Sequence, residues 1–221
     1  MTPFLAMRTI RALTIRADAA STNDAQRSTR ANPSLKGRRA ALRSIAAPLV
    51  LGSVFNFEGE KPQNLGVQSF NGETIGLALC PSTPNCVGTA DEFSDAQHYV
   101  PAWTYVDEEK VARGAARTTR EDAMAQLIDV VETTDCDGFA ATIVDKREDY
   151  LRVEYKSKIF GFVDDVEFWF PQDQSAKEKA RVEYRSASRL GQSDGDVNRK
   201  RIRALRLALT QKYGWKSVGF S

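Results

Sequence analysis

The sequence predicts an α+β domain in which an antiparallel four-stranded sheet carries two helices on one face, in the order α-β-β-β-β-α. Two segments show apolar residues at helical spacing, and between them lie four short segments with the character of strands. A run of strands flanked by helices is typical of this fold class. A long ordered loop over residues 74–105 is expected to precede these elements, because its aromatic residues need a surface on which to pack.

The first helix is predicted from Thr118 to about Thr133. Residues 118–121 read TTRE and fit the capping box T-x-x-E, in which side chains satisfy free amides of the first turn. The apolar residues that follow recur at i, i+3, i+4 and i+7, and they are Met124, Leu127, Ile128 and Val131.

Four strands are predicted next, at residues 139–146, 150–156, 162–170 and 180–186. Apolar and charged residues alternate most clearly in 150–156, which indicates one buried and one solvated face. The last helix is predicted over Asp196–Tyr213. Its expected N-cap is Asp194 or Asp196, its core face carries Ile202, Leu205 and Leu209, and Gly214 ends it.

The first 57 residues have the composition of a targeting segment. They hold nine Lys/Arg and two acids, a charge of +7, so residues 58–221 of this +2 chain carry −5. An Arg-rich, acid-poor start is typical of a plastid transit peptide, and a disordered basic tail is the alternative. Arg38 and Arg39 precede the apolar run 40–51, which resembles a twin-arginine signal for the thylakoid lumen. Extended to Phe57 the run reaches 18 residues, so a membrane anchor that is not cleaved is a further alternative.

We therefore divide the chain into a leader at 1–57, a linker at 58–73 and a single α+β domain at 74–221. We expect it in the chloroplast, in the thylakoid lumen. An acidic domain without an aromatic-interleaved basic patch argues against nucleic acid as a partner.

Cys80 and Cys86 enclose a short loop with two prolines, CPSTPNC. In an oxidising compartment they would form a disulfide, which for so short a loop contributes about 2 kcal/mol. Free thiols and a redox or metal role are the alternatives. His98 is the only histidine of the chain, and we expect no metal or cofactor. Cys136 has no evident partner.

The strand FVDDVEFWF places one acid among apolar residues. Alternation puts Asp164 on the same face as Val166 and Phe168, where a carboxylate needs a cation or several donors. Arg185, Arg189 or Arg199 is the expected partner. A structural ion pair at the junction of strand and helix is one interpretation, and a ligand or acid/base site is the other.

The opposite face of this strand carries Asp165 and Glu167. Charged residues on both flanking strands are expected to pair with them across the sheet as a solvated charge ladder. On the last helix, Arg199, Arg203 and Arg206 form a basic stripe. A solvated face is expected there, and docking to an acidic partner or a lipid headgroup is the alternative.

The segment RSASRLGQSDGDVNRKR, residues 185–201, joins the last strand to the last helix. Such dense polar chemistry is costly to bury unpaired, so it must form an internal network, a ligand site or both. The candidate site residues are Asp164, Asp165, Glu167, Arg185, Ser186, Ser188, Arg189, Asp194, Asn198 and Arg199.

Three blocks, CPSTPNCV, DYLRVEYKSKIFGFVDDVEFWF and RSASRLGQSDGDVNRKRI, occur in this order. With them the chain resembles the domain of unknown function 1499 family over about Leu77 to Tyr213. The resemblance implies an envelope or plastid protein and implies no activity. The positions that match the family's pattern are Cys80, Pro81, Asn85, Cys86, Gly191 and the ten candidate residues named above.

We therefore expect a non-enzymatic binding or assembly protein of the photosynthetic membrane. G-x-S-x-G, P-loop, H-E-x-x-H and GxGxxG motifs are all absent from the sequence. The expected partner is a thylakoid membrane protein or a small anionic ligand, with at most peripheral membrane association. The alternative is a hydrolase-type enzyme in which Asp164 is the acid or base and Arg185 or Arg189 holds an anionic substrate.

Overall fold

The structure, a computed structural model, describes residues 57–172 and 180–218. The transit peptide and lumen signal predicted over residues 1–57 therefore lie, except for Phe57, outside the described residues. None of the helices within these described ranges is long and apolar enough to cross a membrane.

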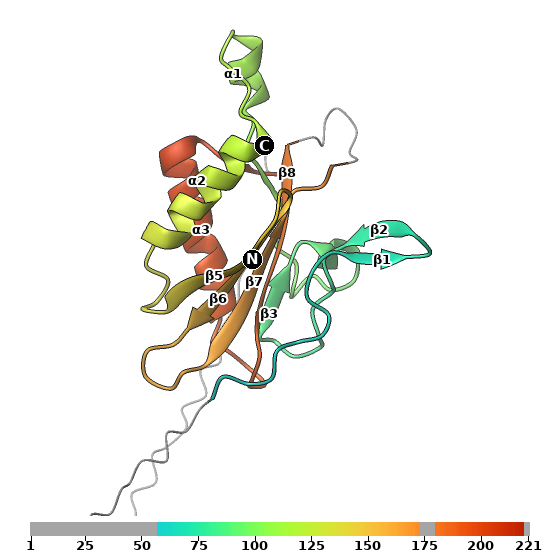
Figure 1. The fold of residues 1–221 in the computed structure, drawn as a ribbon, viewed down its shortest axis with the longest axis vertical. Helices are drawn as coiled ribbons and strands as arrows, with labels where there is room; N and C mark the ends of the chain where they lie inside the picture. Colours follow the sequence, from blue (N-terminus) through green and yellow to red (C-terminus); the bar gives the residue numbers. More distant parts are fainter. Residues whose placement is uncertain (1–56, 173–179, 219–221) are drawn as a thin grey trace, which may run out of the picture. The chain divides into compact units, whose positions relative to one another are not determined.

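The centre of the fold is an antiparallel sheet in which four consecutive strands pair in sequence order (Figure 1). They are β5 (Ala140–Lys146), β6 (Tyr150–Lys156), β7 (Val163–Trp169) and β8 (Arg181–Ser188). The predicted α+β class and antiparallel sheet are confirmed. All four strands lie where the alternation of apolar and polar residues placed them, within two residues at each end.

The sheet has seven strands and not the predicted four. The three additional strands are short: β3 (Cys86–Gly88), β4 (Trp103–Thr104) and β9 (Lys216–Ser217). β3 pairs with the second half of β8, and β4 pairs with its first half. β9 pairs with β4. Segments of two or three residues are too short to show a period of two, so the sequence pattern gave no signal for them.

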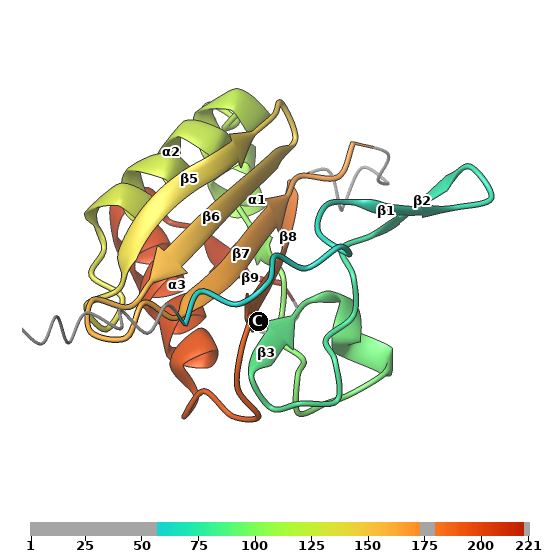
Figure 2. The ribbon, with the colours of Figure 1, turned by 60° about the horizontal axis from the view of Figure 1, so that its bottom comes forward.

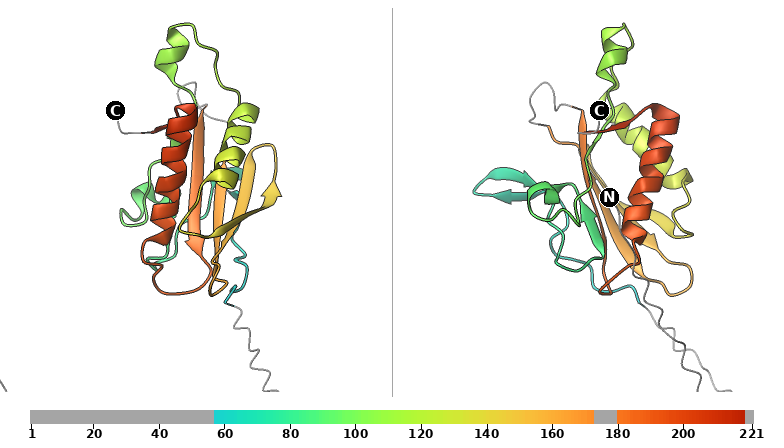
Figure 3. Two further views of the ribbon diagram at one scale, coloured as in Figure 1. Left: turned by 90° about the vertical axis from the view of Figure 1, so that its left-hand side faces the viewer. Right: turned by 180° about the vertical axis from the view of Figure 1, so that it is seen from behind.

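Two helices, α2 (Arg120–Thr133) and α3 (Val197–Tyr213), lie on one face of the sheet, as predicted (Figure 3). The N-cap of α2 is Thr119, whose hydroxyl accepts from the Asp122 amide, so the helix is capped one residue later than predicted. A short helix, α1 (Glu108–Ala112), precedes α2 and was not predicted. α3 ends at Gly214, which adopts a left-handed φ of 78° as a helix stop requires.

The hydrophobic core lies between the sheet and these two helices. Leu127 and Val130 of α2 and Leu205 and Leu209 of α3 are fully buried against Val153 of the sheet. The long segment predicted as an ordered loop extends the sheet beyond β8 and adds side chains to this core. It contains β3, the 3-10 helix η1 (Ala90–Phe93) and β4, and the aromatic residues that pack are Trp103 and Tyr105.

The other face of the sheet is crossed by residues 57–67, which we call the N-terminal strap (Figure 2). The strap leads into a hairpin of β1 (Gln68–Phe70) and β2 (Glu73–Gly76). Residues 58–73, expected to be a linker, therefore include the strap and most of this hairpin. The strap covers the face of the sheet on which four of the ten predicted site residues lie.

Candidate functional site

Strand β7 distributes three predicted site residues over two faces. Asp164 shares the helix-covered face with the core residues Val166 and Phe168, whereas Asp165 and Glu167 point to the strap-covered face. The three acids are 3%, 1% and 0% exposed. A carboxylate buried to this degree needs a cation or several donors, and each face supplies them from a different part of the chain.

On the helix-covered face, Asp164 forms an ion pair with Arg201 of α3. Nη2 of Arg201 donates to a carboxylate oxygen of Asp164 at 2.6 Å, and both side chains are almost fully buried. The Arg201 guanidinium also lies over the rings of Tyr155 and Phe139, with its central carbon 4.5 and 4.9 Å from the two ring centres. The charge is thus held by one carboxylate and two aromatic faces.

The prediction that Asp164 pairs with Arg185, Arg189 or Arg199 is wrong. Arg185 and Arg189 point to the strap-covered face, and Arg199 is exposed on the surface. Arg201 reaches the acid because it lies four residues before Leu205 and so belongs to the buried stripe of α3.

Asn198 connects this ion pair to its surroundings and is 1% exposed. Its side-chain NH₂ donates to Ser188 Oγ (2.9 Å), an Asp194 carboxylate oxygen (2.7 Å) and the carbonyl of Asn85 (3.0 Å). Its side-chain oxygen accepts from Ser186 Oγ (2.5 Å) and Arg201 Nη1 (2.9 Å). We call these residues the helix-side cluster: Asp164, Ser186, Ser188, Asp194, Asn198 and Arg201. The cluster fastens the end of β8 to the start of α3.

Asp194 is the acid that caps α3. Its carboxylate accepts from the amides of Asp196 (3.0 Å) and Asn198 (2.8 Å), whereas Asp196 has a left-handed φ of 65° and its side chain makes no capping bond. Of the two predicted caps, Asp194 therefore satisfies the free amides.

On the strap-covered face, seven residues form what we call the strap-side cluster: Tyr150, Arg152, Glu154, Asp165, Glu167, Arg185 and Arg189. Glu167 is its most buried member. It accepts from the Tyr150 hydroxyl (2.8 Å), the Gly66 amide of the strap (2.5 Å) and Arg185 Nη1 (3.3 Å). Burial, reinforced by the Glu167 charge, raises the pKa of Tyr150, so this hydroxyl keeps its proton and remains a donor.

Asp165 is held by two arginines. Arg152 Nη1 donates to it at 2.8 Å, and Arg189 donates through Nε and Nη2 at 2.7 and 3.0 Å. Both arginines also donate to Glu154. The hydrogen bonds to Asp165 raise the pKa of Arg189, which is consistent with a permanently charged two-pronged contact.

The prediction of a solvated ladder is wrong, although the predicted cross-strand pairing exists. Glu167 lies opposite both Arg152 and Arg185 in the sheet register, yet all three side chains are buried. The strap excludes water from them. It passes so close to the end of β8 that a Cβ on Gly59, whose φ is +71°, would lie 2.8 Å from Cβ of Arg189.

The predicted disulfide between Cys80 and Cys86 is confirmed, with the two Cα atoms 5.7 Å apart. It ties the segment before β3 to the sheet. The buried carboxylate of Asp91 accepts from the Cys80 amide and holds the loop from its other side. Cys136 is free and buried, and burial raises the pKa of its thiol, which makes the thiol a poor nucleophile.

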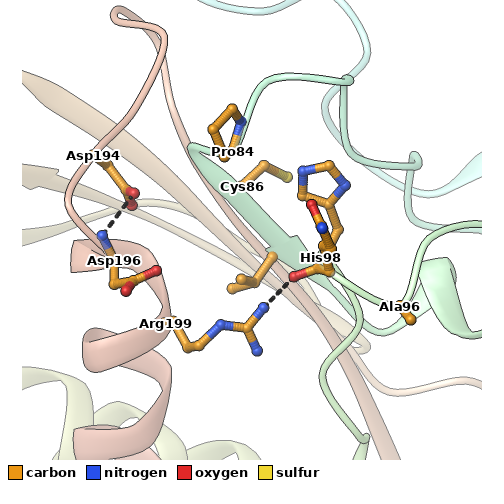
Figure 4. Close-up of a pocket in the computed structure, with 9 residues that line it drawn as sticks. Pro84, Cys86, Ala96, His98, Asp194, Asp196 and Arg199 are labelled. Atoms are coloured by element: carbon orange, nitrogen blue, oxygen red, sulfur yellow. Dashed lines mark hydrogen bonds between the residues drawn. The ribbon is translucent and has the colours of Figure 1, made fainter. Parts of the chain in front are cut away.

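Beside this disulfide lies a pocket of about 390 Å³, which we call the disulfide pocket (Figure 4). The start of α3, the disulfide loop and the segment after η1 form its walls. Its lining residues are Pro84, Cys86, Val87, Ala96, Gln97, His98, Asp194, Asp196 and Arg199. Unlike the two clusters, this pocket presents charged groups at the surface.

Arg199 and His98 have fixed positions in this pocket. The Arg199 guanidinium donates to the carbonyls of Gln97 and Tyr99 (Figure 4 shows the first of these bonds). The buried His98 ring lies between the Asp95 carboxylate, 3.1 Å from Nδ1, and the Thr83 carbonyl, 3.2 Å from Nε2. The pocket therefore joins two carboxylates, one guanidinium already bonded to backbone, and an anchored imidazole.

The structure thus sorts the ten predicted site residues into three places. Five belong to the helix-side cluster and four to the strap-side cluster, and Arg199 lies in the disulfide pocket, which Asp194 also lines. The ten candidates did not include Arg201, Arg152 and His98, although Arg152 lies on one of the flanking strands that were expected to pair with Asp165 and Glu167. The helical period of Leu205 and Leu209 marked Arg201 as buried, whereas nothing local marks His98 as part of a pocket.

Within the described ranges, no three or more His, Cys, Asp or Glu residues are grouped so that they could hold a metal ion. The family model described as "Protein of unknown function (DUF1499)" matches residues 76–209 of the chain. No curated protein and no solved structure matches this chain.

Proposed function

We propose that this chain, which belongs to the DUF1499 family, is a non-enzymatic binding protein of the chloroplast, located in the thylakoid lumen. Its role would be assembly or accessory work at the photosynthetic membrane. The binding site in this proposal is the disulfide pocket, and the partner is a membrane protein that places a polar segment there.

The observation that carries the proposal is the contrast between sealed clusters and an open pocket. Asp164 is buried and bonded to Arg201, and Arg185 and Arg189 are bonded to acids beneath the strap. A hydrolase that used Asp164 would need it to reach both substrate and water. In the sealed arrangement Asp164 can reach neither a substrate nor water, which supports a structural role for these residues.

The charges of the disulfide pocket favour a polar or basic segment of a protein over a small anion. Asp196 brings an exposed carboxylate to it, and Asp194 brings a second carboxylate that already caps α3. The guanidinium of Arg199 already has two backbone acceptors. An anion would meet both carboxylates and compete for an arginine in use. A small anionic ligand is thus the weaker form of the proposal.

The lumen location is supported by two independent features. The leader has the composition of a transit peptide followed by a twin-arginine-like signal. The Cys80–Cys86 disulfide is the bond expected of a protein that works in an oxidising compartment.

Site-specific photocrosslinking in isolated thylakoids tests the proposed binding site. A benzoylphenylalanine in place of the exposed pocket residue Ala96 is expected to yield one discrete adduct with a membrane protein. The same group in place of Ala112, exposed on α1 and outside the pocket, is the matched control and should give no such adduct.

Asp196→Asn makes the test specific, because asparagine tolerates the left-handed φ at this position while the charge is removed. The variant should fold normally and lose most of the adduct. An adduct that appears equally at both positions would overturn the proposal. A saturable hydrolytic activity that disappears in Asp164→Asn would do the same and would restore the hydrolase alternative.

A further inference from the structure

Large apolar side chains gather on the surface at one end of the sheet. Eleven large hydrophobic residues in the described part of the chain are exposed, and five of them lie at this end. We call these five the aromatic patch: Phe57, Ile159, Phe160, Phe162 and Leu190. Ile159 is 84% and Phe160 57% exposed. An apolar cluster of this kind on a polar domain marks an interaction surface.

The patch is one continuous feature. The ring centre of Phe162 lies 5.2 Å from that of Phe57 and 5.8 Å from that of Phe160. The amide of Arg189 donates to the carbonyl of Val163, which holds the chain after β8 beside the start of β7. Leu190 follows Arg189 and lies against Gly59 of the strap, two residues after Phe57.

A tight turn between β6 and β7 presents the most exposed members. The amide of Gly161, whose φ is +71°, donates to the Ser157 carbonyl, and the Phe162 amide donates to the Ser157 hydroxyl. Ile159 and Phe160 therefore occupy the tip of a projecting turn (Figure 2). A projecting tip suits insertion into a deformable layer better than it suits a groove.

The chain enters the described domain at this patch. Phe57 packs on Phe162, and the seventeen residues before it, 40–56, contain a single charged residue, Arg43. No spacer separates this apolar run from the patch. Lys158, exposed in the same turn, supplies a cation at its border, whereas the charge of Lys156 is paired with Glu58. Apolar side chains bordered by lysine are typical of surfaces that lie in the interface of a bilayer.

We propose that the aromatic patch docks the domain on a lipid bilayer, with Ile159 and Phe160 inserted at the level of the headgroups. This inference goes beyond the proposed partner binding and does not depend on the disulfide pocket. The alternative, a second copy of this chain, is a separate outcome of the test.

The test uses the full chain with Ile159→Cys carrying an environment-sensitive fluorophore. Cys80 and Cys86 are bonded to each other and Cys136 is buried, so the label is confined to position 159. Vesicles of phosphatidylcholine and phosphatidylglycerol should shift its emission to the blue, and nitroxide lipids should quench it. Phe93→Cys, at a position 97% exposed on η1, is the matched control and should stay solvated on the same vesicles.

A second measurement compares the partition of unlabelled variants. Ile159→Asp and Phe160→Asp are each expected to weaken vesicle binding by about tenfold, the effect of withdrawing one large apolar side chain. Phe93→Asp should have no effect. Because these positions are exposed, unfolding is not expected, and an unchanged urea midpoint checks it.

Two results would overturn the proposal. The label at 159 could stay solvated on vesicles that bind the chain through its leader, in which case the patch is not inserted. It could also become shielded without lipid as the protein concentration rises, which would assign the patch to a second copy. Neither result bears on the pocket, which the crosslinks at Ala96 report separately.

Discussion

Removing one partner of the buried ion pair between Asp164 and Arg201 is predicted to be among the most destabilising changes to a polar residue, because it leaves the other charge buried and unpaired. Arg201→Met keeps most of the side chain's volume and removes the charge and its donors. Breaking a buried ion pair in this way costs about 3–5 kcal/mol. The two lost hydrogen bonds, to Asn198 at 2.9 Å and to Ser186 at 3.3 Å, add up to about 1 kcal/mol each.

The expected total of about 3–7 kcal/mol is large against the 5–15 kcal/mol or so that stabilises a typical domain. Urea denaturation measures it, with fluorescence of the buried Trp103 and Trp215 as the signal. Arg203→Met, an exposed position of the same helix, is the matched control and should change stability by less than about 0.5 kcal/mol. Should Arg201→Met fail to fold, Arg201→Lys retains the charge and is expected to lose less.

A double-mutant cycle with Asp164→Asn separates the pair from the remaining contacts of Arg201. If the two charges stabilise each other, the double variant should be more stable than the sum of the single losses predicts, by about 2 kcal/mol or more. A coupling energy below about 0.5 kcal/mol, or a loss in Arg201→Met no larger than in Arg203→Met, would refute the reasoning.

Two further predictions concern the disulfide and the contact between the helices. Replacing both Cys80 and Cys86 with serine should lower the free energy of unfolding by about 2 kcal/mol, and an unchanged urea midpoint would contradict this. Hydrogen bonds from Lys212 and Tyr213 hold the pKa of Asp129 below its ordinary value. Because this pKa is lower in the folded state, the ionised carboxylate stabilises the fold at pH values above the unfolded pKa of about 4. This stabilisation is lost as the pH falls through the folded-state pKa. Asp129→Asn should therefore lose less stability than the parent chain on acidification, and equal losses would exclude this contribution.

The main elements of the fold were predictable because each has a strong local signal. Strand β6 alternates charged and apolar residues, and α2 shows four apolar residues at helical spacing. The short strands β3 and β4 have no such signal, because they exist only through pairing with the edge of β8. Their positions follow from tertiary contacts and not from local propensity.

The composition of the site was predictable, whereas its pairing was not. Alternation along β7 correctly placed Asp164 on the apolar face and Glu167 on the other. Choosing the partner of Asp164 required knowing which turn of α3 crosses β7. The helical period of Leu205 and Leu209 places Arg201 on the buried face of α3, but it does not say which strand that turn meets. The burial of Glu167 depends on a contact with Gly66, 101 residues away along the chain. No pattern within a strand reports a contact of that range.

The N-terminal strap lies outside the region that the family model matches, and this bears on its role in covering the strap-side cluster. The match covers residues 76–209 and so contains both carboxylate clusters, but it does not contain the strap at 57–67. Asp165 has all of its bonded partners, Arg152 and Arg189, within the matched region. Glu167 instead takes one of its donors, the Gly66 amide, from outside that region. The ion pairs of the strap-side cluster thus form within the matched region, whereas the strap, which lies outside that region, shields the cluster from water. The same strap connects the domain to the apolar run before Phe57.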